Sequence, residues 1–444
     1  MRIVSGAFDR VHGNLLVLSQ VRGQRRIPYL PEERVHELRD ARIRETVSYA
    51  AETVPYYRDL FRREGIDGRE ITGAAELEQL PRLSRAEVQE DPDRFVSQSK
   101  LGRESIPFRT TGSTGTPVRY HHDRRSVLQN IAYAERGRHV EVRLLGRELG
   151  YTKVSLARST GTGAAVRSLY DRMTWIPLRP RRRRVDFSQP LGAVIAEIDE
   201  AKPDIIRGYG SFVELLFRHV AANDIRMHLP RVIVYGSDTM TLEGRELIER
   251  EFGIPVVSRY NATECFQIAH FCEERRDFHV QADICHLLIV RADGTKAAPG
   301  EQGEIVLTNL VNRGSVFLNY RIGDTAALRD GRCSCGRTSP LLAELAGRVE
   351  DIVRLDDGTL VFPRSLWDIV KQHREILRYQ LVQLDPGRFE LRLVTAAPAQ
   401  FEPLAAEIEP KVARLYGGAR IETVYHEALE PGPGGKFRSV AALR

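Results

Sequence analysis

The chain has 444 residues, 42% of them hydrophobic and 28% charged; this balance excludes a disordered or fibrous protein, and the length allows two or three domains. Its 66 lysines and arginines against 60 aspartates and glutamates give a net charge of +6, which is too small to indicate a nucleic-acid partner by itself. No apolar run reaches the roughly 18 residues of a membrane helix, and Asp9, Arg10 and His12 interrupt the stretch where a signal peptide would be apolar. We therefore expect a cytoplasmic protein without a membrane or nucleic-acid partner, and the sequence leaves a homodimer open.

The first hundred residues are predicted to be mostly helical. Apolar residues at helical spacing predict a helix over 33–54, interrupted by Pro55 and the pair Tyr56-Tyr57, and a second helical stretch follows around Asp59–Glu64.

Between about residues 105 and 330, short β-branched runs alternate with helical patterns. The clearest runs are DIIRGYG (204–210), RVIVYGSD (231–238) and IPVVSRYNATE (254–264). This alternation is typical of βαβ units and a parallel sheet, whose ligands lie at the carboxyl ends of the strands.

The sequence pattern changes after Arg348. Two hairpin patterns and two helical patterns predict a compact α+β unit, over 352–362, 365–373, 378–394 and 401–416. The glycine- and proline-rich tail (430–439) is predicted to be an exposed, adjustable loop. We predict an α/β fold with a large N-terminal domain (1–346) of parallel-rich sheets and helices and a small α+β C-terminal domain (347–444).

The densest basic run comprises Arg179 and Arg181–Arg184. It fits a solvated loop, or a rim that steers a nucleotide or another phosphorylated ligand. A nucleic-acid site is disfavoured because no aromatic residues are interleaved with the arginines.

The segment FRTTGSTGTPVRY (108–120) concentrates small and hydroxylated residues before Pro117. Glycines let a backbone curl around an anion, and amides and hydroxyls then bind phosphate oxygens. The Walker pattern is absent because no Lys-Ser/Thr follows the last glycine. Taken alone, this loop fits a surface turn as well as a phosphate cradle.

Four further motifs follow in order: RYNATE (259–264), NYRIGD (319–324), GRVED (347–351) and GPGGKF (432–437). Individually, their charged residues fit helix caps, ion pairs or surface charges. The ordered set resembles the adenylate-forming superfamily of acyl-CoA synthetases. ETVPYYRDLF and LPRLSRAEV near the N-terminus resemble its phenylacetate-CoA ligase branch and the capsule-biosynthesis relatives of that branch.

This resemblance implies a role for each motif. The loop would hold the β- and γ-phosphates of ATP through Thr110, Thr111, Gly112, Ser113, Thr114 and Gly115. Val118 stands where the family often has a lysine, so amides, Mg²⁺ and Arg119 would neutralise phosphate charge. The remaining nucleotide contacts would come from Ser237, Asp238, Tyr260, Asn261, Thr263, Asp324 and Arg348, with Tyr260 stacking on adenine and Asp324 binding the ribose.

The catalytic pair implied by the resemblance is Lys436 and Glu264. Glu264 would help hold Mg²⁺, which prefers carboxylate and phosphate oxygens. A positioned ammonium stabilises charge that develops on phosphoryl oxygens, so Lys436 on a mobile C-terminal domain would enter for adenylation and leave afterwards. Glu350, where the family usually has aspartate, would be the hinge.

The five cysteines all lie between Cys265 and Cys335 and are odd in number, which argues against a disulfide framework. Three thiols and an imidazole, Cys272, His279, Cys333 and Cys335, form a closed set for structural zinc; the alternative is reduced cysteines buried as small hydrophobes. Cys265 and Cys285 are then spare, and His270 and His286 are weaker alternative ligands.

The predicted activity is ATP-dependent activation of a carboxylic acid to an acyl-adenylate, with pyrophosphate release and acyl transfer to coenzyme A. Because VRLDDGTLVFP replaces the family's glycine-bearing stretch after the hinge, an amine or a carrier-protein thiol is an alternative acceptor. A nucleotide-binding accessory protein without catalysis is a further alternative. Tyr209, Phe212 and Phe266 suggest an apolar or aromatic acyl pocket, although core positions explain them equally well.

Overall fold

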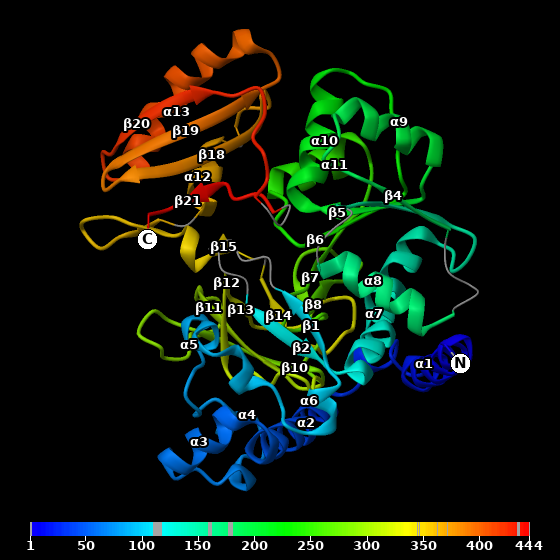
Figure 1. The fold of residues 1–444 in the computed structure, drawn as a ribbon. Coiled ribbons are helices and arrows are strands. Elements are labelled where there is room, and N and C mark those ends of the chain that lie inside the picture. Colours follow the sequence, from blue (N-terminus) through cyan, green and yellow to red (C-terminus); the bar gives the residue numbers. More distant parts are fainter. Residues whose placement is uncertain are drawn as a thin grey trace.

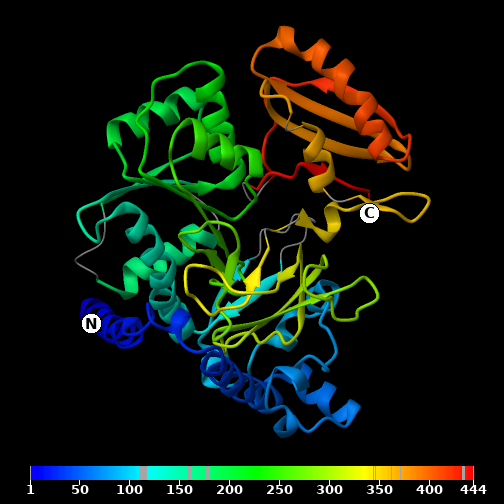
Figure 2. The same cartoon turned by 180° about the vertical axis from the view of Figure 1, so that it is seen from behind.

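The computed structural model describes residues 2–109, 118–158, 162–175, 181–343, 345, 347–361, 363–370, 372–432 and 436–443. The chain forms a large N-terminal part and a smaller C-terminal lobe, residues 353–443, with the helices between residues 191 and 251 lying beside that lobe (Figure 1). The view from behind shows the same arrangement, with the helices of the first hundred residues at the opposite end of the molecule (Figure 2). The predicted α/β class is confirmed.

The N-terminal helices are close to the prediction. They are α1 (Arg2–Val21), α2 (Glu32–Thr53), α3 (Pro55–Glu64), α4 (Ala74–Leu77), α5 (Arg85–Glu90) and α6 (Lys100–Arg103). Pro55, Tyr56 and Tyr57, which were predicted to interrupt the helical pattern, instead form the first turn of α3, because a proline at the first helical position loses no intrahelical hydrogen bond. Within the part of the chain that the structure covers, no helix is long and apolar enough to cross a bilayer.

A nine-stranded sheet runs in the order β13-β14-β9-β8-β7-β6-β5-β3-β4. Its parallel strands are β3 (Thr152–Leu156), β4 (Arg181–Val185), β5 (Ile205–Tyr209), β6 (Val232–Gly236) and β7 (Val256–Tyr260). Its antiparallel strands are β8 (Ala269–Phe271), β9 (Phe278–Val280), β13 (Leu328–Arg329) and β14 (Leu341–Leu342). The parallel half confirms the predicted βαβ pattern.

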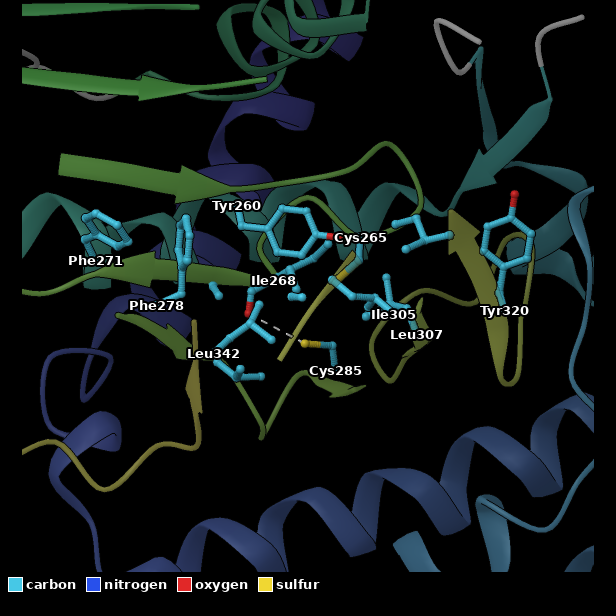
Figure 3. Packing of buried hydrophobic residues seen from close by; sticks show 14 of the residues in the cluster. Tyr260, Cys265, Ile268, Phe271, Phe278, Cys285, Ile305, Leu307, Tyr320 and Leu342 are labelled. Atoms are coloured by element: carbon cyan, nitrogen blue, oxygen red, sulfur yellow. Dashed lines mark hydrogen bonds between the residues drawn. The ribbon is translucent and has the colours of Figure 1, made fainter. Parts of the chain in front are cut away.

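Helices cover both faces of the parallel half (Figure 1). The helices are α7 (Arg124–Leu145), α8 (Thr162–Met173), α9 (Leu191–Ala201), α10 (Gly210–Ala222) and α11 (Leu242–Glu251). Alternate residues of one strand enter different cores: Ile205 packs in the largest core cluster and Ile206 in the cluster that holds residues of α9–α11. Figure 3 shows the largest cluster, where the Tyr260 ring lies with Phe278 and the Cys285 thiol donates to the Ile268 carbonyl oxygen at 3.8 Å.

Two smaller sheets complete the N-terminal part. β1 (Ile106–Arg109) pairs with β2 (Arg119–His122) on either side of the threonine-rich loop. A second sheet has the order β10-β11-β12-β15, with bounds Cys285–Val290, Gly303–Asn309, Tyr320–Ala326 and Gly347–Arg348. Its last pairing sets Asp324 opposite Arg348.

The C-terminal lobe has its own hydrophobic core, built from residues between Val353 and Ala442. Its elements are β16 (Val353–Arg354), β17 (Leu360–Val361), α12 (Pro363–Val370), β18 (Ile376–Asp385), β19 (Arg388–Thr395), α13 (Phe401–Leu415), β20 (Arg420–Tyr425) and β21 (Val440–Ala441). Both predicted hairpins are present. The boundary between residues 346 and 347 stays a prediction, because Gly347 and Arg348 still pair with β12.

Candidate active site

A cavity of about 280 Å³ lies between the two parts of the molecule. Nine residues predicted from the motifs line it: Ser237, Asp238, Tyr260, Asn261, Thr263, Glu264, Asp324, Arg348 and Lys436. They come from the ends of β6 and β7, from β12 and β15, and from the C-terminal tail. Motifs spread over two hundred residues therefore converge on one space.

Asp324 is held by two partners across the cavity wall. The Tyr260 hydroxyl donates to Asp324 Oδ2 at 2.8 Å, and Arg348 Nε lies 3.2 Å from Asp324 Oδ1. Register explains the second contact, since Asp324 and Arg348 are paired residues on β12 and β15. Both carboxylate oxygens are thereby fixed in position.

Glu264 follows β7 and is only 7% exposed. Asn309 Nδ2 donates to its backbone oxygen at 2.8 Å, which anchors the loop. Burial raises the pKa of the Glu264 carboxyl, and Arg348, Lys436 and Arg85 oppose that shift. Glu264 is thus a buried carboxyl within the field of three cations.

Lys436 reaches this space from the C-terminal lobe. Burial is the main cause of its lowered pKa, and Arg348 lowers that pKa further. Asp324, Asp238 and Glu264 act in the opposite direction. The ammonium thus lies within the field of three carboxylates.

Backbone and side-chain contacts tie the Lys436 loop to the N-terminal part. The Phe437 amide donates to Asp238 Oδ2 at 3.4 Å, and the same oxygen accepts from Ser211 Oγ at 2.5 Å. The Arg378 guanidinium lies 4.4 Å from the centre of the Phe437 ring and donates to the Ser211 carbonyl oxygen at 3.2 Å. Asp238 therefore joins the start of α10 to the residue next to Lys436.

Comparisons with known proteins agree with this geometry. No family model matches the chain. Phenylacetate-coenzyme A ligase of Thermus thermophilus is 24% identical over 94% of this chain and 98% of its own length, and that of Escherichia coli is 25% identical over 79% of each. The structure of 2-hydroxyisobutyryl-CoA ligase in the postadenylation state with 2-HIB-AMP has a TM-score of 0.75 at 17% identity, covering 94% of this chain and 91% of that chain.

The chain is similar to these ligases, which are adenylate-forming proteins, over nearly its whole length. The predicted resemblance is thereby confirmed. The TM-score falls to 0.62 for the same 2-hydroxyisobutyryl-CoA ligase in its thioesterification state, over the same share of this chain. The two parts of this protein are therefore arranged more like those of the postadenylation form, with Lys436 lining the cavity.

Several predicted residues are not seen at this site. Thr110, Thr111, Gly112, Ser113, Thr114 and Gly115 lie outside the described residues. Val118 is buried in the core, and Arg119 lies 3.9 Å from Asp93 in an exposed ion pair. The backbone of Glu350 is part of a short 3₁₀ helix, Val349–Asp351, and its side chain is not described. Its role as hinge stays a prediction.

The predicted acyl-pocket residues do not line the cavity. The Tyr209 and Phe212 rings pack on Phe187, with centroids 5.1 and 5.0 Å away. Phe266 stacks on His122 at 4.0 Å in a separate aromatic cluster. Their role stays a prediction.

The structure also adds residues to the cavity. Arg378, Trp367 and Tyr379 of the C-terminal lobe line it, as do Arg85 and Ser211 of the N-terminal part. Arg85 lies within the LPRLSRAEV segment and Ser211 follows the glycines of RGYGSF, whereas no motif surrounds Trp367, Arg378 and Tyr379, which only the tertiary fold identifies.

The four residues of the predicted zinc set lie together at the sheet edge opposite β4. Their ligand atoms are all within 4.8 Å of one another. Cys272 Sγ is 3.6 Å from Cys333 Sγ, and Cys335 Sγ is 3.5 Å from His279 Nε2. A tetrahedral zinc ion with usual bond lengths separates its ligand atoms by roughly 3.5–3.8 Å, so these residues fit zinc.

A buried ion pair supports the two segments that carry these ligands. Arg337, two residues after Cys335, donates to both oxygens of Glu273, which follows Cys272, at 2.6 and 3.1 Å. By contrast, Cys265 and Cys285 belong to the hydrophobic core, and His286 pairs with Glu78 at 3.2 Å. His270 is not in the set of converging ligand atoms.

Proposed function

We propose that this protein activates a carboxylic acid with ATP and transfers the acyl group to coenzyme A. The acid's carboxylate oxygen attacks the α-phosphorus of ATP, the bond to the β-phosphate oxygen breaks, and pyrophosphate leaves. The coenzyme A sulfur then attacks the acyl carbon, AMP departs and the thiol proton is released. The observation that carries this proposal is the Lys436 ammonium, held in one cavity with Glu264, Asp324 and Asp238.

The proposed chemistry divides among the lining residues. Asp324, fixed by Tyr260 and Arg348, accepts hydrogen bonds from ribose hydroxyls once the nucleotide displaces these partners. Lys436 neutralises charge that develops as carboxylate and phosphate approach each other. Glu264 holds Mg²⁺, which supplies charge neutralisation on the phosphates when bound.

A panel of acids tests the activity directly. Full-length protein with ATP and Mg²⁺ is assayed for pyrophosphate release with phenylacetate, hexanoate, adipate and 4-carboxyphenylacetate, each with and without coenzyme A. We expect acid-dependent pyrophosphate release and a thioester product when coenzyme A is present. Pyrophosphate release without any thioester would favour an amine or a carrier-protein acceptor, and no release with any acid would count against the proposed activity.

The Glu264→Gln variant tests the magnesium assignment. Loss of the charge on a ligating oxygen weakens binding of a hard cation, so we expect the Mg²⁺ concentration for half-maximal pyrophosphate release to rise about tenfold or more. The measurement is a Mg²⁺ titration at saturating ATP. An unchanged titration curve would remove Glu264 from the metal site.

The pH dependence of adenylation tests the electrostatics around Lys436. Asp238 raises the pKa of Lys436 and Arg348 lowers it. Because the protonated amine is the active form, activity falls as pH rises through that pKa. Asp238→Asn should therefore move the alkaline limb to lower pH, and Arg348→Gln should move it to higher pH. Profiles of kcat/KM for pyrophosphate release between about pH 7 and 10 measure both shifts. If the alkaline limb of both variants stays at the wild-type pH, the assigned effects of Asp238 and Arg348 on the Lys436 pKa are contradicted.

We also propose that Cys272, His279, Cys333 and Cys335 bind structural zinc. Four protein ligands fill a tetrahedral ion and leave no position for catalysis. The set lies outside the residues that line the cavity, so the ion would stabilise the sheet edge by joining the segment that follows β8 to the loop between β13 and β14.

A further inference from the structure

One face of the parallel sheet carries an unusual number of cations. Register places Arg184, Ser155 and Arg207 side by side on β4, β3 and β5. Lys153 and Arg182 lie on the same face, two residues earlier along β3 and β4. Arg259 of β7 lies further along the strand direction, beside Gly236 of β6. The densest basic run of the sequence thus contributes to a basic face of the sheet.

The charges on this face do not balance. Glu141 of α7 is fully buried, and its Oε2 accepts from Lys153 Nζ at 2.6 Å while its Oε1 accepts from Arg259. Both oxygens are therefore used. Arg207 interacts with Glu141 only through longer-range electrostatics, and no hydrogen bond joins it to a carboxylate among the residues that the structure covers.

The surroundings of Arg207 are unfavourable for a third cation. Burial lowers the pKa of Arg207 to about 10, and Arg259, Arg167 and Arg182 lower it further. A desolvated guanidinium without a partner is costly. Arg207 keeps some accessible surface, so an anion from solution can approach it.

Arg259 adds a second donor that lacks a partner. The residue is 7% exposed, and its Nε has no hydrogen-bond partner within the described part of the chain. Its guanidinium is fixed in place against Gly137 of α7, where an added Cβ would come within 2.9 Å of the Arg259 Cζ. Close packing against α7 and the ion pair with Glu141 therefore hold this guanidinium in place.

The basic face borders the proposed active site. Tyr209 is the next residue after Arg207 on this face of β5, and Ser237, whose side chain is hydrogen-bonded to Tyr209, lines the cavity. Arg259 lines the same cavity. On the other side, Tyr170 of α8 lies within the field of Arg207 and packs in the cluster that contains Phe266. The direction from the cavity past Tyr209 therefore runs along this face of β5 toward Arg207.

We propose that Arg207 and Arg259 form an anion-binding subsite that selects acids with a second carboxylate at the far end of the acyl group. This inference rests on the proposed activation of a carboxylic acid. A bidentate guanidinium–carboxylate pair is a strong and geometrically specific contact, and a site built for a polar group rejects analogues that lack it. The substrate class is therefore an aliphatic or aromatic dicarboxylic acid.

Two matched pairs of acids test the subsite: adipate against hexanoate, and 4-carboxyphenylacetate against phenylacetate. We expect kcat/KM for pyrophosphate release to favour the dicarboxylic member of a pair by about tenfold or more. Arg207→Gln should abolish that preference, and Arg207→Lys should retain part of it. Arg183→Gln is the control, because Arg183 lies on the opposite face of β4 and pairs with Glu197 and Glu200 at 3.2 and 2.8 Å; it should leave the preference unchanged.

A binding measurement separates this proposal from the activity itself. Adipate should raise the Tm of the wild-type protein more than hexanoate does, and Arg207→Gln should remove the difference. If no acid releases pyrophosphate but this difference is present, the proposed activity fails and the subsite stands. Equal kinetics and equal Tm shifts for the members of both pairs would overturn the subsite. The subsite would also be overturned if Arg207→Gln increased only the KM for coenzyme A. That result would mean that the cations bind a phosphate of coenzyme A rather than a carboxylate of the acid.

Discussion

Lys436→Ala should lower the rate of acid-dependent pyrophosphate release by about 10²–10³-fold, because removal of one pre-positioned charge donor typically has that effect. The loss should appear mainly in kcat. The ammonium matters most where charge builds up in the transition state, and substrate contacts from Tyr260, Asp324 and Arg348 remain. Pyrophosphate release at saturating ATP and acid measures the effect.

A half-reaction comparison distinguishes this role from a loss of folding. Thioester formation from a chemically prepared acyl-adenylate does not need the first step, so Lys436→Ala should retain most of that rate. Lys411→Ala is the matched control, because Lys411 is on α13 and pairs with Glu407 at 2.7 Å; it should leave both half-reactions intact. Equal losses in the two half-reactions would contradict a specific role for Lys436 in adenylation.

The parts of the site that could be predicted share a local signal. Ser237, Tyr260 and Asp324 stand at strand ends or glycine turns, and β-branched runs mark the strands that carry two of them. The strands that carry Ser237 and Tyr260 are parallel neighbours, so their ends meet at one edge of the sheet. Asp324 is on β12 of a separate antiparallel sheet, and only the ordered motifs of the family resemblance grouped it with them. Lys436 was assigned only through the resemblance to the adenylate-forming superfamily. The glycines and prolines around it predict an exposed loop, whereas the structure places Lys436 in the cavity.

The parts that could not be predicted depend on long-range pairing. β8, β9, β13 and β14 are only two or three residues long, too short for periodicity to define a strand or its direction. The antiparallel half of the large sheet was therefore missing from the prediction. Arg378 is similar: its contacts with Ser211 and Phe437 join segments far apart in the chain, and nothing adjacent to it in sequence indicates them.

The predicted zinc set combines residues that local spacing could predict with residues that only long-range strand pairing brings together. The spacing of Cys333 and Cys335 is a local signal for chelation, whereas Cys272 and His279 reach them only because β9 pairs with β14. That pairing sets His279 opposite Leu341, six residues after Cys335. Because the strands are so short, few backbone hydrogen bonds hold this edge, and the metal would supply much of its stability.

Cys333→Ser should therefore release zinc and destabilise the protein. A hydroxyl is a poor substitute for a thiolate ligand, and the loss of a structural metal belongs among the mutations that cost about 3 kcal/mol or more. We expect roughly one zinc per wild-type chain by elemental mass spectrometry, far less zinc in the variant, and a lower midpoint of thermal unfolding for the variant.

Cys265→Ala is the control, because this buried cysteine is in the hydrophobic core and outside the converging ligand atoms; this variant should keep its zinc. Since the four ligands do not line the cavity, the variant that remains folded should retain near-normal kcat, and a selective loss of kcat at unchanged stability would argue for a catalytic metal instead.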